Sequence, residues 1–219
     1  MKIGIVAAME LELSALLKHL TIIKTKEINQ RNFYSCIYGE HQLELVCCGR
    51  GKVNATFYTS ELIQHFQPEI VINLGVSGGI DESLKIFDIL VGEKYCHYDV
   101  RKKQSEQHFP KQLYYFADQE FLNRTLQLNS NIKAATFGTG EAFVTEAEVK
   151  DSIATEFAVQ AVDMESAAIA QCCHLKATRF ISLRAICDKA DAKAINTTED
   201  LQTKASEKLA DILLKLLLN

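Results

Sequence analysis

The chain contains little proline and no surplus of positive charge. Pro68 and Pro110 are its only prolines, and its 219 residues include no low-complexity tract and no obvious linker. The formal net charge is −4 at pH 7, whereas a dedicated nucleic-acid-binding domain is usually basic. We therefore expect one domain over residues 1–219 and no nucleic-acid partner.

Several signatures of metal sites and of common hydrolases are missing. The six histidines show no H-E-x-x-H spacing, and no serine sits in a G-x-S-x-G motif. The seven cysteines include the adjacent pairs Cys47-Cys48 and Cys172-Cys173 within apolar runs, unlike the spacing of zinc sites or disulfide frameworks. We therefore expect no metal, and reduced thiols in the core of a cytoplasmic protein.

The chain also lacks a long apolar run at its N-terminus. Residues 3–8 are apolar, but this segment is too short to span a membrane. Glu10 and Glu12 follow it at once, where a signal peptide would need a longer apolar region and a cleavage site. We expect no targeting signal, no membrane partner and a location in the cytoplasm.

Apolar patterns with the periods of strands and helices alternate along the chain. Strands are expected at residues 3–8, 33–38, 43–48, 70–74, 86–95, 134–138, 159–162 and 179–186, and helices at residues 10–20, 53–66, 121–128, 145–157, 165–174 and 201–217. We expect glycine-rich residues 75–79 and polar residues 102–111 to be loops, and Thr145 with Glu148 to form a capping box. The alternation predicts an α/β fold, a three-layer sandwich with a mixed central sheet covered on both faces.

Several unusual residues fall at the predicted strand ends, where open α/β sheets bind their ligands. Each has an ordinary structural explanation: Glu12 suits the first turn of a helix, and Asp188 suits a turn or a cap. The glycine segment matches neither a dinucleotide motif nor a P-loop. Glu165 opens an apolar helix and Arg184 lies within a strand, so both charges need partners.

The chain resembles the nucleoside phosphorylase/hydrolase superfamily, and within it the bacterial methylthioadenosine/S-adenosylhomocysteine nucleosidases. The matching segments run in order through the chain: MKIGI (1–5), AMELE (8–12), GKVNA (51–55), PEIVIN (68–73), GG (78–79), GEAFV (140–144), VDMESAAIA (162–170) and LRAICDKAD (183–191). Each segment is weak evidence alone, and the combination is specific.

This resemblance implies hydrolysis of the N-ribosidic bond of a purine nucleoside without metal or cofactor. It implies that Glu12 is the general base that activates water, that Asp188 protonates purine N7, and that Arg184 lies beside the attacking water. This division of labour between two carboxylates is that of glycoside hydrolysis. The resemblance further implies substrate contacts from Met9, Arg50, Val76, Gly78, Phe143 (stacking on the base), Val144 (its backbone on the base edge), Met164 (packing on the sugar) and Glu165 (binding ribose hydroxyls).

Some positions depart from the nucleosidase pattern. They are Arg50 at an apolar position of the 5′-alkylthio pocket, Val76 and Cys187 at serine positions, Thr198 at a phenylalanine position, and the basic run 101–103 in place of aromatic residues. These changes make the 5′ side more polar and more basic. Arg50 is either a surface residue in a turn or a ligand for an anionic group, because guanidinium binds carboxylate and phosphate bidentately.

Two alternatives remain open at this point. One is a phosphorylase of the same superfamily, in which Arg50 holds inorganic phosphate as the nucleophile. The other is a non-catalytic relative that binds a ligand. The resemblance also implies a homodimer in which residues 99–110 reach the active site of the partner.

Overall fold

The computed structural model describes residues 1–218. Within them the strands are β1 (Lys2–Ala7), β2 (Thr21–Ile28), β3 (Arg31–Tyr38), β4 (His41–Cys47), β5 (Ile70–Gly79), β6 (Ile89–His97), β7 (Tyr115–Phe116), β8 (Lys133–Thr139), β9 (Ala161–Asp163) and β10 (Arg179–Asp188). The helices of the described residues are α1 (Glu10–Leu17), α2 (Lys52–Phe66), α3 (Lys102–Gln107), α4 (Gln119–Leu128), α5 (Ala147–Phe157), α6 (Ser166–Leu175) and α7 (Glu199–Leu218), with a 3₁₀ turn η1 (Ala194–Asn196).

Four neighbouring strands, β4, β1, β5 and β10, run parallel at the centre of the sheet. Their side chains are buried on both faces, as in the run Ile70 to Leu74 of β5, which is typical of parallel strands covered by helices. Antiparallel hairpin pairing then adds β3 and β2 beside β4. Because parallel strands end at the same edge, the residues that follow β1, β5 and β10 lie close together.

The other half of the sheet curls into a closed ring. Strand β5 pairs with β10 along its length and with β9 at its end, and β10 continues through β6 and β8 back to β9. The ring therefore brings the end of β9 to the same place as the ends of β5 and β10.

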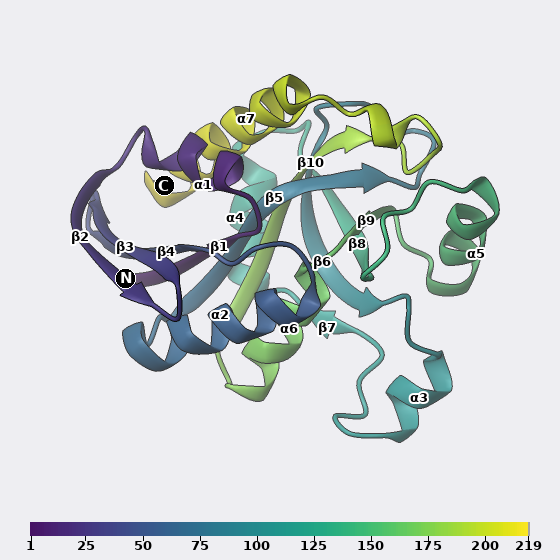
Figure 1. Cartoon of the computed structure of the whole chain (residues 1–219), viewed down its shortest axis with the longest axis horizontal. Coiled ribbons are helices and arrows are strands. Elements are labelled where there is room, and N and C mark those ends of the chain that lie inside the picture. The colour runs from purple at the N-terminus through teal and green to yellow at the C-terminus, as the bar shows by residue number, and fades with distance from the viewer. Residues whose placement is uncertain (219) are drawn as a thin grey trace.

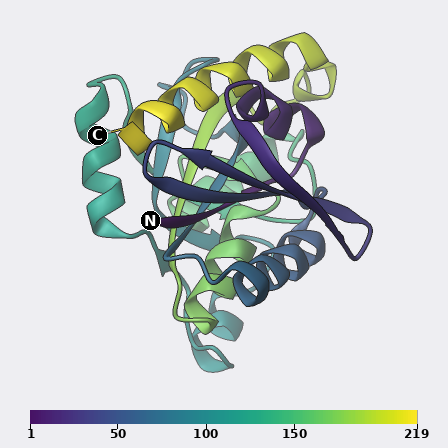
Figure 2. The ribbon, with the colours of Figure 1, turned by 90° about the vertical axis from the view of Figure 1, so that its left-hand side faces the viewer.

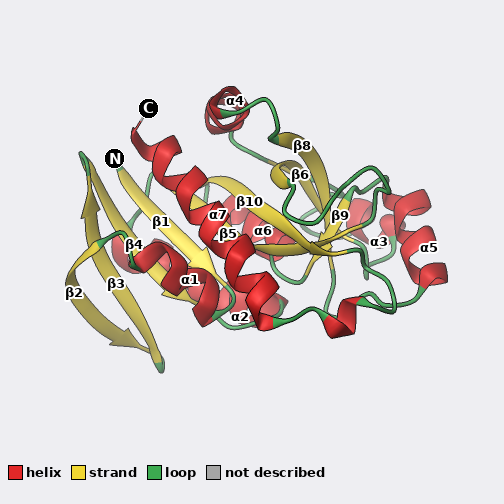
Figure 3. Cartoon of the chain, turned by 90° about the horizontal axis from the view of Figure 1, so that it is seen from above, coloured by secondary structure: helices red, strands yellow, loops and turns green. Residues whose placement is uncertain are grey.

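Helices cover both faces of this mixed sheet (Figure 1). α1 packs against α7 on one face, and α2 packs against α6 on the other. Figure 2 shows the sheet edge formed by β2, β3 and β4 between α7 above and α2 below, and Figure 3 shows α7 from above, where it lies over β5 and β10. The predicted three-layer sandwich with a mixed sheet is confirmed. None of the helices in the described part of the chain is long and apolar enough to cross a membrane.

The first helix is shorter than expected, and a strand follows it that the sequence pattern did not indicate. α1 ends at Leu17 and not at residue 20, and β2 begins at Thr21. Nearly all of β2 is exposed, so its residues show no alternation between a buried and a solvated face. The periodicity that identifies a half-buried strand is therefore absent.

Residues 75–79 were expected to form a loop, but they form the last part of β5. Gly75 pairs with Arg184, and Gly78 pairs with Asp188, on the neighbouring β10. A Cβ atom at Gly75 would lie 2.7 Å from Glu12 Oε1, and one at Gly78 would lie 2.6 Å from Asp188 Oδ1. The glycines make room for charged side chains that cross the strand, and do not form a turn.

Two local predictions in the outer part of the molecule were also wrong. Residues 102–107 form the exposed helix α3, because lysine, glutamine and glutamate favour helix even without a buried face. α5 begins at Ala147 with Glu146 as its N-cap and no side-chain capping bond. Thr145 therefore precedes the cap, and the expected capping box with Glu148 does not form.

Tyr95 connects two strands of the ring. Its buried hydroxyl accepts a hydrogen bond from Ser182 N at 2.8 Å and donates one to Gly92 O at 3.0 Å. Tyr95→Phe should lower the free energy of unfolding by about 1–3 kcal/mol, because it leaves buried backbone groups without a partner. Urea denaturation measures this loss.

The matched control is Tyr58→Phe, which removes an exposed hydrogen bond to Asn29 O. It should change stability much less, because water replaces the lost donor. Equal effects of the two substitutions would contradict the role given to Tyr95.

Candidate active site

The carboxyl ends of β1, β5 and β10 open onto a cavity of about 990 Å³. The residues for which the sequence predicts catalysis or substrate contact all line it: Met9, Glu12, Arg50, Val76, Gly78, Phe143, Val144, Met164, Glu165, Arg184 and Asp188. They come from strand ends and from the connections that follow them, far apart in the sequence. The structure thus brings the whole predicted set together, while the role of each residue remains to be tested.

Glu12 lies in the first turn of α1, but it is not a solvated residue there. Its side chain is only 1% exposed. Oε2 accepts hydrogen bonds from Ala8 N at 3.0 Å and Met9 N at 2.9 Å, and Oε1 accepts one from Val76 N at 2.9 Å. Burial raises the pKa of this carboxyl, and the charge of Arg184 and the three backbone donors act in the opposite direction.

Arg184 carries a fully buried guanidinium on β10, 1% exposed. Nη2 donates to Asn73 Oδ1 at 2.6 Å, and Nη1 donates to the carbonyl of Val76 at 3.0 Å. Nε lies 3.4 Å from Asp163 Oδ2, and Nη2 lies 3.5 Å from Glu165 Oε2. Two buried carboxylates therefore compensate this cation, as a charge in a central strand requires.

Glu165 precedes α6 and joins two parts of the cavity wall. Its Oε1 accepts a hydrogen bond from Gly51 N at 3.0 Å, at the start of α2. Burial raises the pKa of the Glu165 carboxyl to about 7, partly opposed by the charge of Arg184. Asp163 stabilises the same turn, because its Oδ1 accepts hydrogen bonds from Thr139 Oγ1 and from the backbone N–H groups of Glu165 and Ser166.

Asp188 is the last residue of β10, whereas the sequence pattern predicted a strand that ends at residue 186, with Asp188 just past its end. Its Oδ1 accepts a hydrogen bond from Ala190 N at 2.8 Å, and its Oδ2 accepts one from the thiol of Cys187 at 3.2 Å. Burial raises the pKa of Asp188, and no cation is among the groups that lower it. Asp188 is therefore suited to hold a proton that it can donate.

An apolar wall lies next to Asp188. Val144 and Val162 are buried there, whereas the Phe143 side chain is 53% exposed and borders the cavity. A ring that is free on one side offers a face on which a planar base can stack.

Arg50 is exposed, as a surface residue in a turn would be, and it also lines the cavity. Its Nη2 lies 3.0 Å from Met9 Sδ, and no carboxylate of the described residues lies within ion-pair distance of it. The wall near α7 is polar, because Thr197, Glu199 and Gln202 line it. Thr198 does not line the cavity, and its hydroxyl accepts a hydrogen bond from Leu201 N at 3.3 Å.

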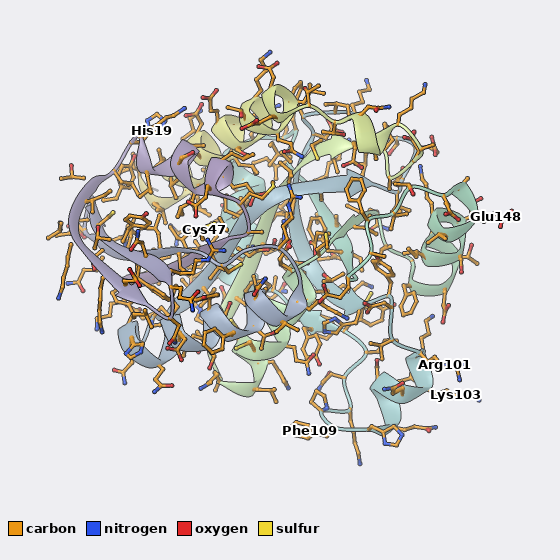
Figure 4. The ribbon with its side chains drawn as sticks, in the orientation of Figure 1. His19, Cys47, Arg101, Lys103, Phe109 and Glu148 are labelled. Atoms are coloured by element: carbon orange, nitrogen blue, oxygen red, sulfur yellow. The ribbon has the colours of Figure 1, made fainter. Side chains whose placement is uncertain are left out.

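The basic run 101–103 is not part of this cavity. Arg101 and Lys103 project into solvent around α3, on the opposite side of the molecule from His19 and well away from Cys47 at the end of β4 (Figure 4). Lys102 lies over the ring of Phe157 at 5.2 Å. Within one chain, this run leaves the 5′ side of the cavity no more basic.

Sequence reasoning gave no role to Asn73 and Asp163, although both bind Arg184. Both stand within the segments that match the family, and a buried polar residue in an apolar strand such as β5 signals a specific partner. Glu141 was also missed; its Oε1 accepts a hydrogen bond from Lys52 N at 2.7 Å beside the cavity.

Among residues 1–218, no group of three or more His, Cys, Asp or Glu side chains is placed so that it could hold one metal ion.

Comparison with known proteins matches the Phosphorylase superfamily model over residues 2–218. The 5′-methylthioadenosine/S-adenosylhomocysteine nucleosidase of Staphylococcus epidermidis is 34% identical over 215 residues, with 93% of each chain covered. A crystal structure of S-adenosylhomocysteine nucleosidase from Streptococcus pyogenes with 5-methylthiotubericidin has a TM-score of 0.94 at 34% identity, covering 99% of this chain and 96% of that one. Futalosine hydrolase of Helicobacter pylori has a TM-score of 0.92 at 25% identity, covering 99% and 97%.

The raised pKa of Glu165 predicts a pH dependence of stability. Its pKa is about 7 in the folded chain against an ordinary value of 4.5, so the folded state binds the proton more tightly. This contribution is fully present below pH 4.5 and is lost as the pH rises through about 7. Relative to Glu165→Gln, the wild-type chain should therefore lose unfolding free energy across this window, as measured by urea denaturation at several pH values.

Glu156→Gln is the matched control, because Glu156 is an exposed carboxylate on α5. Its pH profile should follow that of the wild type. Parallel profiles for wild type and Glu165→Gln would show that folding does not raise the pKa of Glu165.

Proposed function

Because the chain belongs to the phosphorylase superfamily, we propose that it hydrolyses the N-ribosidic bond of adenosine-type nucleosides, methylthioadenosine and S-adenosylhomocysteine among them, and releases the free base. One observation carries this proposal: two buried carboxylates from separate elements, Glu12 and Asp188, face one cavity with different electrostatic surroundings. We also propose that residues 1–219 form one domain.

Glu12 acts as the general base. Cleavage of the bond from C1′ to N9 builds positive charge on the sugar, and water attacks C1′ from the face opposite the base. The three backbone N–H groups fix the Glu12 carboxylate, and Arg184 favours its ionised form. An ionised carboxylate in that position takes a proton from water and stabilises the positive sugar.

Asp188 acts as the general acid. The departing purine gains electron density, and a proton on N7 makes it a better leaving group. Burial keeps the Asp188 carboxyl protonated to a higher pH than usual, and its hydrogen bonds to Ala190 N and Cys187 fix its direction.

The remaining predicted residues bind the substrate. Glu165 accepts hydrogen bonds from ribose hydroxyls and Met164 packs on the sugar, while Phe143 stacks on the base and the backbone of Val144 binds its edge. Met9, Val76 and Gly78 line the cavity between these groups. No step of this mechanism requires a metal or a cofactor.

Hydrolysis is favoured over phosphorolysis by the pairing of Arg184. A phosphorylase needs a cation that is free to hold phosphate beside C1′. Arg184 is already bound to Asn73, Asp163 and Glu165, so it offers phosphate no free guanidinium, and the phosphate dependence of turnover tests Arg50, the other arginine that lines the cavity.

We propose a homodimer as the working form. A groove of about 760 Å³ runs between α2 and α6, and it exposes the apolar side chains of Val53, Phe57 and Leu175. The groove adjoins the active site through Lys52, whose ammonium binds Asp99 at 2.7 Å. We assign a second copy of the chain to this groove as its occupant.

The buried thiols of the cysteines are consistent with a reducing, cytoplasmic location.

Glu12→Gln and Asp188→Asn should each lower kcat by about 10²–10⁴-fold, because each removes one proton transfer. Base release from methylthioadenosine, S-adenosylhomocysteine and futalosine, with and without inorganic phosphate, provides the assay.

Glu165 contacts only the sugar in this mechanism, so Glu165→Gln should raise KM as well as lower kcat. Near-normal kcat in either of the first two variants would remove that residue from the mechanism, and dependence on phosphate would identify a phosphorylase.

Light scattering at micromolar concentration should give twice the mass of one chain. Phe57→Glu, in the groove, should yield the monomer, because it would bury a charge in an apolar interface. Val149→Glu is the matched control, since Val149 on α5 is 42% exposed and Phe57 is 45% exposed. A wild-type monomer, or equal behaviour of the two variants, would contradict this interface.

A further inference from the structure

We infer that Tyr98 and Asp99 are positioning residues for the purine base, and this inference rests on the proposed function. In that proposal Phe143 stacks on the base, and the backbone of Val144 binds its edge. Both contacts come from residues 140–144, the base segment, which lies between the end of β8 and the start of α5. The side chains that hold the base segment therefore fix the place where the base can bind.

Tyr98 follows β6 and packs against the beginning of the base segment. Its hydroxyl donates a hydrogen bond to the carbonyl of Ala142 at 2.8 Å, and the residue lines the cavity. A Cβ atom at Gly140 would overlap the Tyr98 ring, and one at Gly138 would lie 3.2 Å from it. The two glycines thus allow the ring to lie directly on the backbone that leads into the base segment.

Asp99 binds the backbone of the same segment. Its Oδ2 accepts a hydrogen bond from Glu141 N at 3.1 Å, and both of its carboxylate oxygens lie 2.7 Å from Lys52 Nζ. This ion pair is partly shielded from water, because 28% of the Asp99 side chain and 21% of the Lys52 side chain are exposed. An ionised carboxylate is a stronger acceptor for a backbone N–H than a neutral group is.

The N-terminus of α2 connects the base segment to the sugar site. Gly51 N donates a hydrogen bond to Glu165 Oε1 at 3.0 Å, and Lys52 N donates one to Glu141 Oε1 at 2.7 Å. Glu165 binds the ribose hydroxyls in the proposed function, whereas Glu141 belongs to the base segment. Two adjacent residues therefore hold the sugar half and the base half of the site at a fixed separation, and the positive end of the helix favours both carboxylates.

The base segment depends on these hydrogen bonds because most of it is exposed. Glu141, Ala142 and Phe143 are exposed, and Val144 is buried. Ordering an exposed backbone costs conformational entropy at each residue. When Tyr98 and Asp99 already hold the segment, the base does not have to order it, so its affinity is higher.

The test uses adenine, which occupies only the base half of the site. Its dissociation constant is measured by calorimetry for the wild-type chain, Tyr98→Phe and Asp99→Asn. Tyr98→Phe should weaken adenine binding by about three- to tenfold, as expected for one neutral hydrogen bond, and Asp99→Asn should weaken it by about tenfold.

Turnover of methylthioadenosine gives a second measurement on the same variants. Both should raise KM and leave kcat nearly unchanged, because stacking holds the base equally in the ground state and the transition state. A fall in kcat without a loss of adenine affinity would overturn the inference, since it would place Tyr98 and Asp99 in the chemical step.

Tyr58→Phe and Asp88→Asn are the matched controls. Tyr58, like Tyr98, donates a hydrogen bond to a backbone carbonyl. Asp88, like Asp99, binds one lysine ammonium and one backbone N–H, and 24% of its side chain is exposed. Neither control residue lines the cavity, so adenine affinity should stay at the wild-type value in both.

Unchanged adenine affinity in Tyr98→Phe or in Asp99→Asn would overturn the inference for that residue, and an equal loss in its control would do the same. Absence of adenine binding by the wild-type chain would refute the base site and the inference with it. Adenine binding without any hydrolysis of nucleosides would refute the proposed function alone, because the comparison of affinities does not require turnover.

Discussion

The buried guanidinium of Arg184 is the constraint on which the site depends. It lies in β10 with 1% of its surface exposed, against Asn73 on β5, Asp163 on β9 and Glu165 at the start of α6. Removal of one partner of a buried ion pair typically costs about 3–5 kcal/mol, because an uncompensated charge remains. The cluster therefore fixes the ends of three strands in one arrangement, and Gly75 has no side chain because Arg184 and Glu12 occupy that space.

The same cation gives two carboxylates in one cavity different chemical roles. Glu12 is buried, but Arg184 and three backbone donors favour its ionised form. Asp188 is also buried, and no cation opposes the resulting rise in its pKa. Pairs of carboxyl groups whose surroundings drive their pKa values apart supply a base and an acid at the same pH. The order β1, β5, β10 places Glu12 within reach of Arg184 over Gly75, whereas Asp188 stands further along β10, beside Gly78.

The position of the site could be predicted from the sequence, because its residues lie at or near the ends of buried strands. Apolar periodicity identifies those strands. Residues that precede or follow β1, β5 and β10 were predicted to meet, and they do. Periodicity could not identify β2, which is exposed on both faces, or show that Gly75 to Gly79 continue a strand. The partners of Arg184 were also out of reach, because contacts between residues 73, 163 and 184 depend on the closure of the ring.

The origin of the oxygen added to the sugar tests the central claim most directly. Methylthioadenosine is incubated with the chain in ¹⁸O-labelled water that contains unlabelled phosphate, and the products are examined by mass spectrometry. Activation of water by Glu12 predicts free adenine without label and a sugar that carries ¹⁸O at its anomeric hydroxyl. A sugar 1-phosphate, or an unlabelled sugar, would contradict the account.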